Sequence, residues 1–117
     1  MKQKTLALAY GTLKQGHYNH RVMEQAGGKF IENVTIDASM YSFGPFPTIK
    51  INTGDSVSCE LYEIEDIAPL DWLEGYPSHY FRSIVKTSTG KQAWVYHIPE
   101  KDKKILETLP KVHSGVW

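Results

Sequence analysis

One glutamate of the sequence lies in a context that suits acid/base chemistry. Glu74 ends an apolar segment and stands directly before Gly75-Tyr76-Pro77, with Tyr80 shortly after it. The negative end of a helix dipole and nearby aromatic surface both favour a protonated carboxyl group, so the pKa of Glu74 is predicted to be raised. Such a group passes protons near neutral pH. An exposed glutamate in a charged last turn is the alternative, and Asp71 is expected to be a surface or locally hydrogen-bonded residue.

A glycine pair near the start of the chain raises the question of phosphate binding. Gly11 and Gly16 have the G-x-x-x-x-G spacing of a phosphate loop, but His17 and Tyr18 follow where lysine and a hydroxyl residue are required. Nucleotide hydrolysis is therefore disfavoured. Backbone N–H groups of the same loop can still hold a carboxylate or a developing oxyanion, although a plain structural turn is an equally simple interpretation.

Metal and nucleophile chemistry finds little support in the sequence. His17 and His20, with His79 or His97, form a weak set of metal ligands without a second histidine pair or a cysteine pair, so we expect no metal and no cofactor. The single cysteine, Cys59, excludes an internal disulfide, and the absence of a G-x-S-x-G motif disfavours a nucleophilic triad. Five aromatic residues are expected in the core or on a sheet face: Trp72, Trp94, Tyr62, Tyr96 and Phe81.

Composition excludes several classes of partner. The 117 residues carry 13 basic and 13 acidic side chains, so the positive surplus typical of nucleic-acid and anionic-membrane binders is missing. The longest apolar run, residues 6–10, is far below the ~20 residues of a membrane-spanning helix, and no segment resembles a signal peptide. We expect one domain over residues 1–117, a cytoplasmic location, and neither nucleic acid nor membrane as partner.

The elements that must position these residues follow from periodicity and turn residues. Strands are predicted over residues 5–10, 30–43, 48–51, 56–64, 80–87 and 92–98, with Thr53-Gly54-Asp55 separating two of them. Helices are predicted over 20–25, capped by Asn19, over 66–74, ended by Gly75, and over 101–109. The pattern predicts an α+β fold with a mixed, mainly antiparallel, barrel-like sheet and a few short helices.

Three segments together resemble the γ-glutamyl cyclotransferase-like family, which includes γ-glutamylamine cyclotransferases and plant avirulence-induced proteins. They are LALAYGTLKQGHYNHRVM, similar to the family's strand and Y-G-T-L-K-x-G-x-x-N-H loop, then FPTIKI followed by VSCELYEI, then LDWLEGYPSHYFR. AWVYHI resembles the late strand of the family. The order and spacing are also similar, and the resemblance spans nearly the whole chain.

The resemblance implies a pocket between the first loop and the end of the helix that carries the glutamate. It assigns the acid/base role to Glu74 and adds Tyr80 and Tyr96 as aromatic pocket residues. Arg82 matches the family's trailing arginine, either as a substrate contact or in a structural ion pair. Substrate binding through backbone groups is assigned to the first loop: Tyr10, Gly11, Thr12 and Leu13.

The implied reaction needs no covalent nucleophile. The α-amine of a γ-glutamyl substrate attacks its own γ-carbonyl, a five-membered ring closes, and an amine leaves together with the product 5-oxoproline. Such an enzyme positions the chain, moves protons and stabilises the tetrahedral oxygen, which fits a backbone loop and one carboxylate.

The sequence departs from the family pattern at two positions and leaves three functions open. Cys59 stands where the family commonly has glycine in G-E-L-Y, which predicts a narrower backbone approach near the first loop, and His79 adds an imidazole beyond Glu74. The functions are a cyclotransferase, a non-catalytic module that binds a small carboxylate ligand or a partner's terminus, and a structural protein with an unused pocket. The leaving group, amine or amino acid, depends on walls expected from residues 41–47, 57–60 and 113–117.

Overall fold

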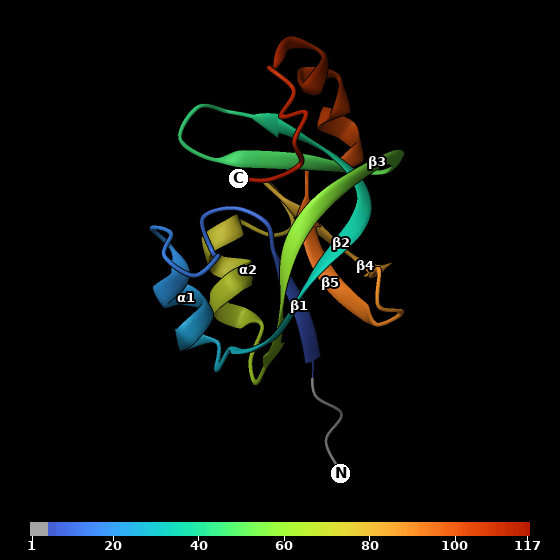
Figure 1. Ribbon diagram of the computed structural model, residues 1–117. Helices are drawn as coiled ribbons and strands as arrows, with labels where there is room; N and C mark the ends of the chain where they lie inside the picture. The colour runs from blue at the N-terminus through green and yellow to red at the C-terminus, as the bar shows by residue number, and fades with distance from the viewer. Residues whose placement is uncertain (1–4) are drawn as a thin grey trace.

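Figure 1 presents the computed structural model, which describes residues 5–117. Two short α-helices, α1 (His20–Gln25) and α2 (Ala68–Glu74), lie side by side on one side of the sheet, and a 3-10 helix, η1 (Glu100–Thr108), lies above the long hairpin in this view. Five strands form the sheet: β1 (Thr5–Ala9), β2 (Lys29–Ser42), β3 (Pro47–Ile64), β4 (Phe81–Lys86) and β5 (Gln92–His97).

The sheet has the strand order β2-β3-β1-β5-β4, in which β1 pairs in parallel with β5 and the other neighbouring strands pair antiparallel. Its two edges approach each other, because the amide of Ser88, just after β4, donates a hydrogen bond of 2.9 Å to the carbonyl of Thr35 in β2. Lys91 also forms an ion pair with Glu32 there. These contacts join the two edges of the curled sheet, and the predicted α+β fold with a mainly antiparallel sheet is confirmed.

Strand β1 separates two apolar clusters because its side chains alternate between the sheet faces. Leu8 points into the cluster that the curled sheet encloses, together with buried residues of β2, β3 and β5. Ala7 and Ala9 belong to the second cluster with Met23 of α1 and Leu70 of α2. The small side chains of Ala7 and Ala9 let both helices pack close to the sheet on this face.

The predicted break within the hairpin is wrong. Residues predicted as two strands form the single strand β3, and Thr53-Gly54-Asp55 marks a bulge within it. Asp37 pairs with Ser56 while the next residue, Ala38, pairs with Ile51, so four residues of β3 have no counterpart in β2. Positive φ angles of 62° at Asn52 and 90° at Gly54 allow the chain to loop out and rejoin the ladder.

Helix ends agree with the sequence in part. Gly75 ends α2 in the left-handed conformation, with a φ of 64°, as predicted. Asn19 occupies the position before α1, but its side chain makes no capping hydrogen bond to the helix backbone. Instead its Nδ2 donates to Oγ1 of Thr12 at 3.0 Å. The predicted helix over 101–109 is the 3-10 helix η1. No helix within residues 5–117 has the length and apolar character needed to cross a bilayer.

Candidate active site

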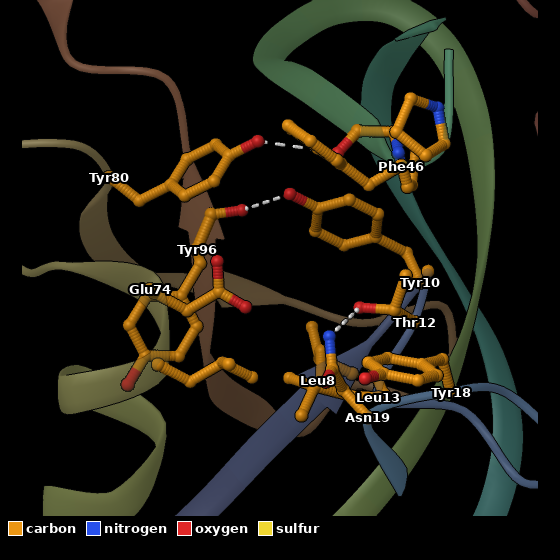
Figure 2. Close-up of a pocket in the computed structure, with 15 residues that line it drawn as sticks. Leu8, Tyr10, Thr12, Leu13, Tyr18, Asn19, Phe46, Glu74, Tyr80 and Tyr96 are labelled. Carbon is orange, nitrogen blue, oxygen red and sulfur yellow. Dashed lines mark hydrogen bonds between the residues drawn. The ribbon is translucent and has the colours of Figure 1, made fainter. Parts of the chain in front are cut away.

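A cavity of about 500 Å³ lies where the end of β1, the start of β3 and the end of α2 meet. Figure 2 shows Glu74, Tyr10, Tyr80 and Tyr96 around it, with the first loop on the opposite side from α2. Seven of the eight residues predicted for the site line this cavity, which brings the loop and the glutamate together: Tyr10, Gly11, Thr12, Leu13, Glu74, Tyr80 and Tyr96.

Glu74 presents its carboxylate to the interior of the cavity (Figure 2). No hydrogen bond or ion pair to this carboxylate occurs among residues 5–117. Burial raises the pKa of Glu74 to about 7, because the charged form loses water and gains no partner. The raised pKa itself was predicted from the sequence. The prediction attributed it to the helix dipole and to aromatic surface, whereas loss of water on burial is its cause in the structure. A carboxyl group with this pKa is populated in both protonation states near neutrality.

The first loop lines the cavity on the side opposite Glu74. The amide groups of Gly11, Thr12 and Leu13 donate no hydrogen bond within the described part of the chain, so they remain able to donate to a ligand. Neighbouring contacts hold the loop in place: the amide of Lys14 donates to the carbonyl of Gly11 at 3.0 Å, and the amide of Asn19 donates to the carbonyl of Thr12 at 2.8 Å. Free amides on a fixed loop suit a carboxylate or an oxyanion.

Gly11 is the tightest point of the loop. A Cβ atom at this position would lie 2.5 Å from Cγ and 2.8 Å from Cδ of Pro47 at the start of β3. Only glycine therefore allows the loop to approach the hairpin so closely.

The hydroxyls of Tyr10 and Tyr80 in the cavity are hydrogen-bond donors. Tyr10 donates to the carbonyl of Tyr96 at 2.7 Å, and Tyr80 donates to the carbonyl of Pro47 at 3.4 Å. Burial raises the pKa of Tyr10 well above its usual value and that of Tyr80 to about 12. Both hydroxyls consequently stay protonated near neutral pH and cannot act as bases there.

Arg82 does not line the cavity. Its Nε donates to Oδ1 of Asp71 at 2.8 Å, and its guanidinium lies over the rings of Tyr76 and Trp94, 4.5 Å and 4.3 Å from their centroids. Tyr96 joins the group by donating its hydroxyl to the same Oδ1 of Asp71 at 2.7 Å. The structural ion pair, one of the two roles that the sequence left open, is the one observed. Arg82 and Asp71 support Tyr96 from behind the cavity wall.

Some cavity residues were not predicted: Leu8, Ala9, Tyr18, Asn19 and Leu73. Pro45, Phe46 and Pro47 complete the lining. Asn19 lies in the Y-G-T-L-K-x-G-x-x-N-H motif of the first loop, so the sequence contained a signal for this residue. Of the predicted walls, only residues 45–47 contribute to this cavity, whereas residues 57–60 and 113–117 do not.

Cys59 belongs to the apolar cluster inside the sheet, together with Tyr10 of the first loop, and does not line the cavity. One further expectation is wrong. Trp72, expected in the core or on a sheet face, is 86% exposed on α2.

Two of the histidines considered as metal ligands form hydrogen bonds with different residues. His20 bonds the carbonyl of Leu13 through Nδ1 at 2.9 Å, and His97 bonds the hydroxyl of Ser83 through Nε2 at 2.7 Å. Within residues 5–117, no group of three or more histidine, cysteine or acidic side chains is arranged to hold a metal.

The amino-acid sequence is similar to that of known proteins. Residues 7–117 match the family described as "Gamma-glutamyl cyclotransferase, AIG2-like". A Vibrio cholerae protein named "Putative gamma-glutamylcyclotransferase" is 32% identical over 116 residues, which cover 96% of this chain and 94% of the relative.

Solved structures of similar fold span almost the whole chain. The mouse AIG2-like protein superposes with a TM-score of 0.81 at 22% identity, over 99% of this chain and 89% of its own. The Escherichia coli protein YtfP superposes with a TM-score of 0.70 at 26% identity, over 97% and 96%. The family match and the Vibrio relative both extend over the loop and the glutamate described above. The chain therefore belongs to the gamma-glutamyl cyclotransferase, AIG2-like family.

Proposed function

We propose that this protein is a γ-glutamyl cyclotransferase that releases 5-oxoproline and uses Glu74 as its acid/base. One observation carries the proposal: the carboxyl group of Glu74, which has no hydrogen-bond partner among residues 5–117, lies across a cavity of about 500 Å³ from a loop whose amides donate no hydrogen bond there. The family match supports a γ-glutamyl compound as the substrate.

The proton steps suit a single carboxylate. The reaction forms a bond between the α-nitrogen and the γ-carbon of the substrate and breaks the bond between that carbon and the departing nitrogen. One of the three protons of the α-ammonium group stays on the ring nitrogen, and the other two end on the departing nitrogen, which leaves as an ammonium ion. Glu74 passes these protons in turn, so it begins and ends the cycle as a carboxylate.

The first loop supplies the electrostatic part of the mechanism. Negative charge develops on the γ-carbonyl oxygen when the α-nitrogen attacks it. The amides of Gly11, Thr12 and Leu13 hold the substrate and stabilise this oxygen, and they need no reorganisation because neighbouring hydrogen bonds already fix the loop. The cavity also keeps the γ-glutamyl chain folded so that its two ends meet.

The side chains of the cavity give no support to a covalent intermediate. The Thr12 hydroxyl accepts a hydrogen bond from Asn19, and the raised pKa values of Tyr10 and Tyr80 keep their hydroxyls protonated. Cys59 lies outside the cavity, and burial raises the pKa of its thiol to about 12. A direct intramolecular attack is consistent with this set of residues.

The proposal is tested by measuring 5-oxoproline released from a panel of γ-glutamyl amines and γ-glutamyl amino acids. We expect turnover that saturates with substrate. Folded protein that binds members of the panel and releases no 5-oxoproline would contradict the proposal and support a binding module. Folded protein that neither binds nor turns over any member would favour a structural role.

A further inference from the structure

A second hollow adjoins the proposed active site. It is a groove of about 670 Å³ that runs from the end of α2 to η1. The groove shares Phe46, Leu73, Glu74 and Tyr80 with the cavity. A substrate bound with its γ-glutamyl group in the cavity and its scissile amide beside Glu74 would direct its departing group into this groove.

The walls of the groove expose an unusual amount of apolar surface. Trp72 is 86% exposed, and Phe46 and Ile105 are 42% and 44% exposed. The rings of Phe43 and Phe46 lie 5.3 Å apart and form one side of the groove. An aromatic or large aliphatic group would cover part of this surface and remove it from water.

The charged side chains of the groove bear on the charge of the departing group. Lys101 and Lys104 line it, and neither has an ion-pair partner within residues 5–117. Asp102 is the single acidic residue of the lining apart from Glu74. Glu100 and Lys103, their neighbours on η1, bind each other at 2.8 Å and do not line the groove. The lysines favour a carboxylate and disfavour a second ammonium group.

We propose that this groove is the leaving-group site and that it selects γ-glutamyl conjugates of amino acids with aromatic or large aliphatic side chains over γ-glutamyl diamines. The inference rests on the proposed function, because Glu74 must act at the junction of the two hollows. It narrows the substrate from any γ-glutamyl compound to one whose departing amine carries a carboxylate and an apolar side chain.

Four compounds separate the two features. γ-Glutamylphenylalanine has both the ring and the carboxylate, γ-glutamylphenethylamine has the ring alone, γ-glutamylalanine has the carboxylate with a methyl group, and γ-glutamylputrescine has a second ammonium group instead. We expect kcat/KM to be about tenfold higher for the phenylalanine conjugate than for either single-feature compound, and about a hundredfold higher than for the putrescine conjugate. Equal values within threefold, or a preference for putrescine, would overturn the inference.

Substitutions in the groove test which residues cause the preference for an apolar side chain and which cause the preference for a carboxylate. Trp72→Ala should lower the ratio of kcat/KM for the phenylalanine conjugate to that for the alanine conjugate about tenfold. The double substitution Lys101→Glu with Lys104→Glu should make kcat/KM for γ-glutamylphenylalanine equal to kcat/KM for γ-glutamylphenethylamine. The matched control is Lys29→Glu with Lys86→Glu, which changes net charge equally at two exposed positions outside the groove. The same loss of preference in the control would overturn the assignment of the lysines.

Measured dissociation constants of the γ-glutamyl compounds distinguish a failure of this inference from a failure of the proposed function. If no compound yields 5-oxoproline, the proposed reaction fails, and dissociation constants measured by calorimetry then test the groove. Tighter binding of γ-glutamylphenylalanine than of γ-glutamylputrescine, weakened by Trp72→Ala, would support the groove without turnover. Equal binding of the two compounds would overturn it.

Discussion

Glu74 owes its pKa to burial without a partner, and this determines how activity should depend on pH. The carboxylate must accept a proton from the substrate before the ring can close, so the ionised form is the active one. A neighbouring cation would keep the group ionised at lower pH, but none bonds to it within residues 5–117. Activity is consequently expected to require a pH at which an isolated, half-buried carboxyl group has ionised.

We predict that kcat/KM for 5-oxoproline release rises about tenfold per pH unit below the pKa of Glu74, which is about 7, and levels off above it. The measurement is a series of initial rates at low substrate concentration from pH 5 to 8, with folding checked at each pH. A profile that is flat between pH 5 and 7 would show that Glu74 is not the base.

The residue types of the site could be predicted from sequence, but some side-chain directions could not. Glu74 and the loop residues 10–13 line one cavity because their backbone positions bring them there. Arg82 and Trp72 were harder, because their directions depend on neighbours from other segments. Arg82 turns toward Asp71 and two aromatic rings, and Trp72 projects from α2 toward a groove that η1 completes.

At the scale of elements, the close contact between the first loop and β3 fixes the position of the free amides. We predict that Gly11→Ala lowers kcat/KM tenfold or more and destabilises the fold by about 1–3 kcal/mol, because its Cβ atom would overlap Pro47. Rates and urea denaturation measure the two effects.

Gly90→Ala is the matched control for the loop. Its φ of 86° is strained for alanine, but no atom lies within 4 Å of the added Cβ, and the residue is remote from the cavity. It should cost about 1 kcal/mol of stability with native activity. Native activity in Gly11→Ala would show that the loop position is unimportant.

The link between α2 and β4 gives a second prediction at this scale. Arg82→Lys should destabilise the protein by about 1–3 kcal/mol and lower kcat/KM three- to tenfold, because lysine cannot replace the forked contact with Asp71 or stack between the rings. Lys111→Ala removes an exposed ion pair with Asp55 and should change both quantities far less. Equal effects of the two substitutions would contradict a supporting role for Arg82.

The ends of helices and strands could be predicted where residues close in sequence determine them. The helix over residues 20–25 and the end of α2 at Gly75 were predicted correctly, because periodicity and the left-handed glycine act within a few residues. The bulge in β3 was not, because a Thr-Gly-Asp turn signal looks the same whether the strand ends or rejoins its ladder. Pairing with β2 across the hairpin decides between these outcomes.

At the scale of the whole molecule, the curled sheet and two helices bury a carboxyl group that favours its protonated form. Between the ordinary glutamate pKa of 4.5 and the folded pKa of about 7, the folded state holds a proton that the unfolded state has lost. The contribution of Glu74 to stability is therefore complete below about pH 4.5 and declines as pH rises through 7.

Glu74→Gln removes this titration and should stabilise the protein at pH 8 by about 2 kcal/mol relative to native, with a much smaller difference at pH 5. Urea denaturation at the two pH values measures it. Glu107→Gln, on the exposed side of η1, should show no such dependence on pH. A difference for Glu74→Gln that is equal at pH 5 and pH 8 would contradict the raised pKa.

The most direct test of the account compares kcat/KM for 5-oxoproline release by the native protein, Glu74→Gln and Glu107→Gln at pH 8, with the folding of all three confirmed. We predict that Glu74→Gln loses at least a hundredfold in kcat/KM while it remains folded and still binds the substrate, and that Glu107→Gln retains native activity. Full activity in folded Glu74→Gln would contradict the acid/base role of Glu74 and the mechanism built on it.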